Sequence, residues 1–157
     1  MNDGSSVTAK LAAIEEIKAL KARYFRFVDM KDWAALRDLF LSDATLHFVH
    51  RTDEPEPADI AISRIARVLV SDVVSVHNGG IPEIDVTGDT ATAIWPMSDL
   101  LIFPVDRPNP FGLARLHGFG HYLEDYERRN GVWRIAALRL DRLHVDTTLL
   151  PAAVAAL

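Results

Sequence analysis

The chain has 157 residues, of which 49% are hydrophobic and none is cysteine, and its formal net charge is −5 at pH 7. This length fits one domain, and the lack of cysteine excludes disulfides, thiolate nucleophiles and cysteine-based zinc sites. The basic residues are scattered, no apolar run approaches the length of a membrane span, and the first ten residues are polar, so we expect no nucleic-acid partner, no membrane segment, no signal peptide and a cytoplasmic location.

The first 70 residues carry three helical patterns. We expect residues 1–7 to be frayed and Thr8 to cap a helix that runs to about Val28, because apolar residues recur there at helical spacing. Asp32 is the expected N-cap of a second, shorter helix, and residues 58–70 repeat the helical pattern. The sequence therefore predicts that the N-terminal half is mainly helical.

Two segments separate the second and third helical patterns. Residues 44–49 alternate between polar and apolar side chains and predict a short strand. Residues 52–57 contain two prolines and three acidic residues, which favour a loop that could form a flexible lip.

The remainder of the chain predicts strands joined by turns. We expect strands at 73–86 with a break at Asn78-Gly79-Gly80, and then at 90–105, 111–128 and 132–145. The Gly88-Asp89 and Asn130-Gly131 dipeptides favour hairpin turns between these strands. The apolar tail at 147–157 could cover a pocket mouth or an oligomer interface.

Helices followed by hairpin-connected strands predict an α+β fold with an antiparallel sheet. Because one face of such a sheet must be buried, we expect the sheet to curve like a cone around the N-terminal helices. The whole chain, 1–157, forms a single domain in this interpretation, and the cone has room for an interior pocket.

Two charged residues interrupt apolar faces of the expected strands. Alternation places Asp99 on one face with Trp95 and Met97, and it places Arg139 on one face with Trp133 and Ile135. If both faces point inward, Asp99 and Arg139 meet in an apolar interior. They form either part of a functional site or a structural ion pair, and an assignment wrong by one residue puts both in water.

Three further residues are candidates for proton transfer. His77 lies where an expected strand is interrupted, and imidazole is the usual proton shuttle near neutral pH, although a lone histidine is more often structural. Tyr24 fits the apolar stripe of the first helix as a core aromatic or as a site residue. Asp29 follows five residues later, about 140° around the helix, and lies either in solvent at the helix end or beside Tyr24 if the helix distorts.

No sequence motif indicates a bound cofactor. The chain has no Gly-rich phosphate loop, no nucleophile elbow and no HExxH sequence. His117 and His121 share a strand face, but no third ligand stands at a spacing that makes a convincing metal site. We therefore expect neither cofactor nor metal, and chemistry by general acid–base groups.

Three segments carry a family resemblance. The opening LAAIEEIKALKARYFRFVDMKDWAALRDLFLSDATLHF, the run SVHNGGIPEIDVTGDTATAIWPMSDLL and the run GFGHYLEDYERRNGVWRIAALRLDRLHVD resemble the SnoaL-like families of the nuclear-transport-factor-2-like superfamily. This superfamily includes scytalone dehydratase, polyketide cyclases, ketosteroid isomerase and bile-acid 7α-dehydratase. The resemblance covers nearly the whole chain and is weakest at 50–72 and after 146.

The resemblance implies which residues form a catalytic site. In such dehydratases a tyrosine, two aspartates, a histidine and an arginine line the cone, and the matching positions here are Tyr24, Asp29, His77, Asp99 and Arg139. Many relatives carry a second histidine directly after the first, where this chain has Asn78. We expect the substrate-binding walls to include the side chains of Trp95, Met97, Phe119 and His121.

These expectations favour a cofactor-independent lyase of the dehydratase type that acts on an apolar, ring-containing small molecule. An isomerase or cyclase with the same site, a non-catalytic small-molecule-binding module and a structural subunit are the alternatives. Relatives often form dimers or trimers, which implies a homo-oligomer.

Overall fold

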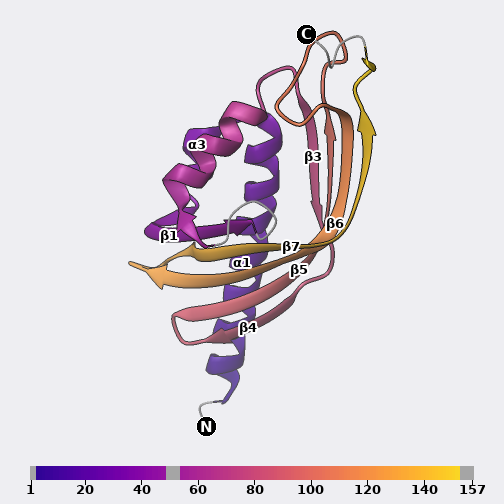
Figure 1. The fold of residues 1–157 in the computed structure, drawn as a ribbon. Helices are drawn as coiled ribbons and strands as arrows, with labels where there is room; N and C mark the ends of the chain where they lie inside the picture. The colour runs from indigo at the N-terminus through magenta and orange to yellow at the C-terminus, as the bar shows by residue number, and fades with distance from the viewer. Residues whose placement is uncertain (1–2, 49–53, 153–157) are drawn as a thin grey trace.

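The computed structural model describes residues 3–48 and 54–152. Helix α1 (Asp3–Met30) is one continuous helix whose buried residues include Ile17, Leu20 and Val28. It begins five residues before Thr8, so the expectation of a frayed segment is wrong for residues 3–7. Figure 1 shows that its N-terminal end projects beyond the strands. No helix of the described residues is long and apolar enough to cross a membrane.

The two other helices are short, and α2 packs against both α1 and α3. Helix α2 (Trp33–Arg37) starts at the expected N-cap, where the Asp32 side chain accepts a hydrogen bond from the backbone N–H of Ala35 at 3.1 Å. Strand β1 (Phe40–Phe48) follows and is longer than predicted. Helix α3 (Ala58–Val68) confirms the third helical pattern.

The segment expected to form a lip is only partly described. Residues 52 and 53 lie outside the described residues, but strand β2 (Glu56–Pro57) pairs antiparallel with β1. Its last two residues therefore belong to the edge of the sheet and not to a free loop.

The second half of the chain is a series of strands, as predicted. The predicted break separates β3 (Val74–Gly79) from β4 (Glu83–Thr87), and three long strands follow: β5 (Thr90–Ile102), β6 (Leu113–Arg129) and β7 (Val132–Leu149). Asn130 and Gly131 have φ values of 53° and 77°, as the predicted hairpin turn requires. Strand β7 includes residues 147–149 of the expected tail, and residues 153–157 lie outside the described residues.

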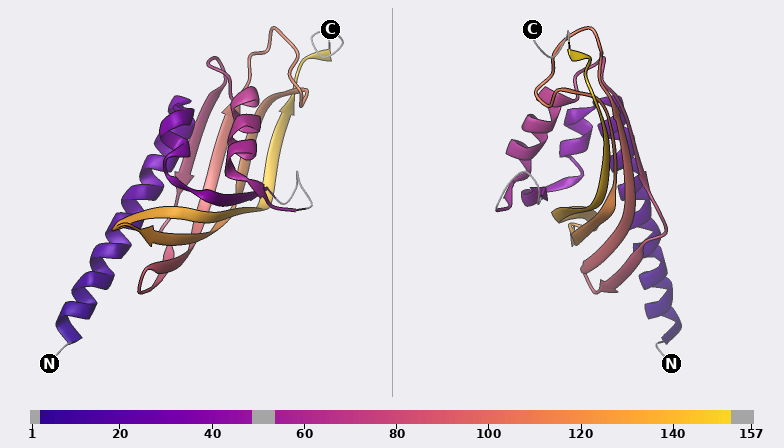
Figure 2. Two further views of the ribbon diagram at one scale, coloured as in Figure 1. Left: turned by 90° about the vertical axis from the view of Figure 1, so that its left-hand side faces the viewer. Right: turned by 45° about the vertical axis from the view of Figure 1, so that its right-hand side comes forward.

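The strands form one sheet in the order β2-β1-β7-β6-β5-β3, with β4 also paired to β5. All pairs among the later strands are antiparallel, but β1 runs parallel to β7, so the sheet is mixed and the expectation of a purely antiparallel sheet is corrected. The sheet bends strongly and does not close into a barrel, and α2 and α3 lie on one side of it (Figure 2). This curvature creates the interior that the α+β prediction required.

Candidate active site

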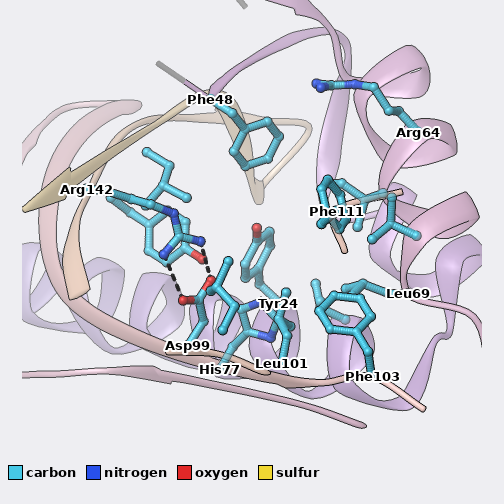
Figure 3. A pocket seen from close by; sticks show the side chains of 16 residues that line it. Tyr24, Phe48, Arg64, Leu69, His77, Asp99, Leu101, Phe103, Phe111 and Arg142 are labelled. Carbon is cyan, nitrogen blue, oxygen red and sulfur yellow. Dashed lines mark hydrogen bonds and ion pairs between the residues drawn. The ribbon is translucent and has the colours of Figure 1, made fainter. Parts of the chain in front are cut away.

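A cavity of about 150 Å³ lies between α3, the C-terminal part of α1 and three strands. The strands line it with residues 99–101 of β5, 116–122 of β6 and 140–142 of β7. Most of its lining is apolar, with leucine and phenylalanine side chains from several of these elements. A small polar group faces the same space: Tyr24, Arg64, His77, Asp99, Tyr122 and Arg142. Figure 3 shows Tyr24, His77 and Asp99 close together, with Arg64 on the other side of the cavity.

His77 is held by Asp29 in two ways. The Nδ1 atom of His77 lies 2.6 Å from Oδ1 of Asp29, and the backbone N–H of His77 donates to Oδ2 of the same carboxylate at 2.9 Å. A carboxylate accepts only, so this contact favours a proton on Nδ1 and leaves Nε2 as the atom that can take a proton from a ligand. The pair has the geometry of an oriented general base.

Helix α1 supplies Asp29 without the expected distortion. The helix continues through Met30, and Tyr24 is buried and lines the cavity, whereas Asp29 lies behind His77 and does not line the cavity. Because Asp29 is at the helix end, its side chain reaches β3 although it points about 140° away from Tyr24. Tyr24 therefore faces the cavity directly, whereas Asp29 affects it only through His77.

Asp99 is buried and pairs with Arg142. Both Nη atoms of Arg142 donate to the carboxylate, with Nη1 to Oδ1 at 2.8 Å. Burial opposes the charge on Arg142, but the hydrogen bonds and the charge of Asp99 outweigh it and hold the pKa of Arg142 above its usual value. Gly118 lies beneath the pair, where a Cβ atom would collide with both side chains.

Arg139 does not enter the cavity, so the expectation for this residue is wrong. Its side chain is 52% exposed and pairs with Asp141 at 2.8 Å on the outer face of the sheet. The cause is a β-bulge: Ile135 pairs with Tyr126 and Ala137 pairs with Asp125, which leaves Ala136 as an extra residue. The bulge reverses the alternation of β7, and Arg142 takes the inward place.

The residues expected to form the walls fall into two groups. Trp95 and Met97 face the interior and are buried, but they belong to the core next to the cavity and do not line it. Phe119 and His121 lie on the outer face, where Phe119 packs against His117 with ring centroids 4.4 Å apart. The expectation that Phe119 and His121 contact substrate is therefore wrong, because inward positions on β6 are the even-numbered ones. Among the described residues, no three potential ligands gather closely enough to hold a metal ion.

A second buried ion pair packs against two tyrosines of the cavity wall and was not predicted. Lys21 and Glu124 pair with side-chain exposures of 1% and 0%, and Tyr126 donates a hydrogen bond to Glu124. The Nζ atom of Lys21 lies 4.0 Å from the ring centre of Tyr24 and 3.7 Å from that of Tyr122. The signal was present in the sequence, because Lys21 lies on the apolar stripe of α1 and Glu124 alternates with two tyrosines on β6.

The environment of Tyr24 keeps its hydroxyl protonated. Burial, followed by the charge of Glu124, raises the pKa of Tyr24 far above its ordinary value of 10. Burial also raises the pKa of Tyr122 well above that value. Both phenols therefore face the cavity as neutral groups that can donate hydrogen bonds.

The comparisons agree with this architecture. A family model described as a SnoaL-like domain matches residues 9–139. Among solved structures, a hexachlorocyclohexane dehydrochlorinase (LinA, type 2) is similar with a TM-score of 0.72 and 18% identity, over 88% of this chain and 90% of that chain. A protein assigned as a scytalone dehydratase from Novosphingobium aromaticivorans gives 0.73 and 16%, over 90% and 91%. Rv3472 from Mycobacterium tuberculosis, a protein of unknown function, gives 0.72 and 24%, over 96% and 86%.

Proposed function

The chain belongs to the SnoaL-like domain family, and from this membership and the His77–Asp29 pair in an apolar cavity we propose that it is a cofactor-independent lyase. The substrate is an apolar, ring-containing small molecule that loses a small group such as water or a hydrogen halide. The homo-oligomeric state and the cytoplasmic location expected from the sequence are part of the same proposal.

The proposed reaction is an elimination by general base catalysis. Nε2 of His77 takes a proton from a ring carbon, the electrons of that C–H bond form the new double bond, and the leaving group departs from the adjacent carbon with its bonding electrons. Asp29 holds the imidazole and stabilises the positive charge that it acquires. The arrangement supports this role because the base faces a largely apolar cavity.

Tyr24 and Arg142 supply the electrophilic side of the proposed reaction. The raised pKa of Tyr24 keeps its hydroxyl neutral, so it donates a hydrogen bond to the departing atom. Arg142, fixed by Asp99, faces the same cavity, where its remaining N–H groups can donate hydrogen bonds to the substrate. Two structural neighbours are named for eliminations, a dehydrochlorinase and a dehydratase, and this favours a lyase over an isomerase or a passive binder.

Substitution of His77 tests the proposal. We expect His77→Ala to lower kcat by roughly 10²- to 10⁴-fold, the usual contribution of a general base. The assay is turnover of ring compounds that carry a leaving group next to an acidic C–H, followed by mass spectrometry of the product. A product of unchanged mass would identify an isomerase or cyclase.

His144→Ala is the matched control, because His144 is exposed on the outer face and pairs with Asp146 at 2.9 Å. This variant should keep wild-type turnover. If His77→Ala also keeps wild-type turnover on a validated substrate, the proposed mechanism is wrong.

A further inference from the structure

The charged side chains that line the cavity already have counter-ions. Among the described residues, Arg142 pairs with Asp99, Arg64 pairs with Glu56, and His77 contacts Asp29. Asp99 is 3% exposed, so its carboxylate is contacted by Arg142 and hardly at all by water. Within the described part of the chain, each charge at the cavity therefore has a counter-ion, although the buried Nε–H of Arg64 has no hydrogen-bond partner there.

A charged ligand would add a charge without a counter-ion to a largely apolar cavity. A carboxylate would have to share Arg142 with Asp99 or Arg64 with Glu56, and each arrangement gathers two anions around one cation. A desolvated charge without its own partner is strongly unfavourable. A neutral ligand avoids this cost, since its oxygen can accept a hydrogen bond from the protonated hydroxyls of Tyr24 or Tyr122.

The cavity volume limits the ligand in size. An apolar cavity of about 150 Å³ accepts benzene, so we expect this partly open one to take a single six-membered ring with a short substituent. The walls that set this volume include Leu101 on β5 and the neighbouring rings of Phe103 and Phe111, whose centroids lie 6.0 Å apart. A fused two-ring compound is larger than this volume, so we expect it to bind more weakly than a single ring.

We propose that the natural substrate is an uncharged, single-ring compound with at least one oxygen that accepts a hydrogen bond. This inference rests on the proposed function, because it names the substrate class of the same cavity. It excludes ring carboxylates, ring amines and fused polycyclic compounds as substrates.

Three probes of nearly equal size test the charge. Binding to the wild-type protein is measured by NMR titration with cyclohexyl methyl ketone, cyclohexanecarboxylate and cyclohexylmethylammonium. We expect the ketone to bind at least tenfold more tightly than either ion. Equal or tighter binding of the carboxylate or the ammonium ion would overturn the inference, and so would a failure of the ketone to bind.

Removing one counter-ion should weaken or remove the preference for the neutral ketone over the carboxylate. In Asp99→Asn the Arg142 guanidinium loses its charged partner, so we expect cyclohexanecarboxylate to gain at least tenfold in affinity while the ketone changes little. Glu56→Gln frees Arg64 in the same way at a position on the edge strand β2, where the Glu56 side chain is 18% exposed, and it serves if Asp99→Asn does not fold. If a folded variant shows no gain for the carboxylate, charge pairing does not control selection.

The size limit is tested with 2-decalone, a neutral fused two-ring ketone. We expect it to bind at least tenfold more weakly than cyclohexyl methyl ketone, and Leu101→Ala to remove that difference by enlarging the cavity. Ile102→Ala is the matched control on the outer face of the same strand, where the side chain is 42% exposed, and it should leave the difference unchanged. Tight binding of 2-decalone to the wild-type protein would overturn the limit.

These outcomes are separate from those of the proposed function. The three probes report charge and size selection without any turnover, whereas His77→Ala reports catalysis. Binding of charged probes together with a large loss of turnover in His77→Ala would remove this inference and leave the lyase proposal standing.

Discussion

Three positions separate two arginines on β7 that face opposite sides of the sheet. Arg142 lines the cavity and holds Asp99, whereas Arg139 lies on the outer face with Asp141. The same guanidinium chemistry is therefore present twice, and only its position relative to the bulge at Ala136 decides which copy can meet a substrate.

A paired substitution uses this difference. Arg142→Gln keeps a donor for Asp99 but removes the charge, and we expect it to lower kcat/KM by about 10²-fold, a typical loss when a charge-stabilising donor is removed. Arg139→Gln should keep wild-type activity, because its side chain is half exposed and remote from the cavity. Steady-state kinetics of both variants on one substrate measure the two values of kcat/KM. An equal loss in both variants would show that Arg142 contributes no more to catalysis than Arg139.

The residues of the site differ in how well the sequence predicts them. The alternation of β5 is uninterrupted, so parity places Asp99 correctly beside Trp95 and Met97. Parity fails on β7 because one extra residue reverses the faces, and a bulge leaves no clear mark in the sequence around it. The Asp29–His77 contact joins a helix end to a strand 48 positions later, and the resemblance, not spacing, predicted that both belong to one site.

At the level of the elements, strand β6 carries a glycine where the ion pair crosses it. Gly118 faces inward between Asp99 of β5 and Arg142 of β7, and a Cβ atom there would occupy the space of both side chains. A glycine in a strand often marks such a close approach. The Asp99–Arg142 pair can span the strand because this position has no side chain.

Gly118→Ala should therefore displace the pair without changing any charged residue. We expect a loss of stability of roughly 1–3 kcal/mol, the usual range for overpacking, together with reduced turnover. Urea denaturation measures the first effect and kinetics the second. Phe119→Ala alters the next residue on the exposed face and should leave turnover unchanged, and unaltered stability and activity in Gly118→Ala would refute the close approach of the ion pair to this glycine.

The secondary structure of the elements could be predicted better than their pairing. The Asn130-Gly131 turn and the Asp32 cap are local signals, and both are confirmed. The parallel pairing of β1 with β7 joins segments about 90 positions apart, and no local pattern reports which edge β1 selects. For the same reason, the sequence predicts that a curved sheet exists but not which face of β6 meets the cavity.

On the scale of the whole molecule, one buried ion pair ties the long helix to the sheet. Lys21 of α1 and Glu124 of β6 are both fully buried, and Trp95 donates to Tyr126, which in turn donates to Glu124. Burial lowers the pKa of Lys21 from 10.5 to about 8, although Glu124 opposes the shift. The charge of Lys21 therefore makes folding depend on pH.

The sign of this dependence follows from proton binding. Between pH 8 and 10.5 the unfolded chain binds a proton at Lys21 that the folded protein has lost, so stability rises with pH across this window. The full contribution is on the order of 3 kcal/mol at 1.36 kcal/mol per pKa unit. Above pH 10 the buried tyrosines oppose it, because their raised pKa values mean that the unfolded chain ionises first and stability then falls.

We expect the unfolding free energy of the wild-type protein to increase from pH 7.5 to a maximum near pH 10. The double variant Lys21→Met with Glu124→Gln removes both charges but keeps an acceptor for Tyr126, so no unpaired buried charge remains and the fold should persist. In this variant the rise should be absent while the fall above pH 10 remains. Urea denaturation at half-unit pH steps measures both curves, and parallel curves for the two proteins would show that Lys21 does not titrate in this window.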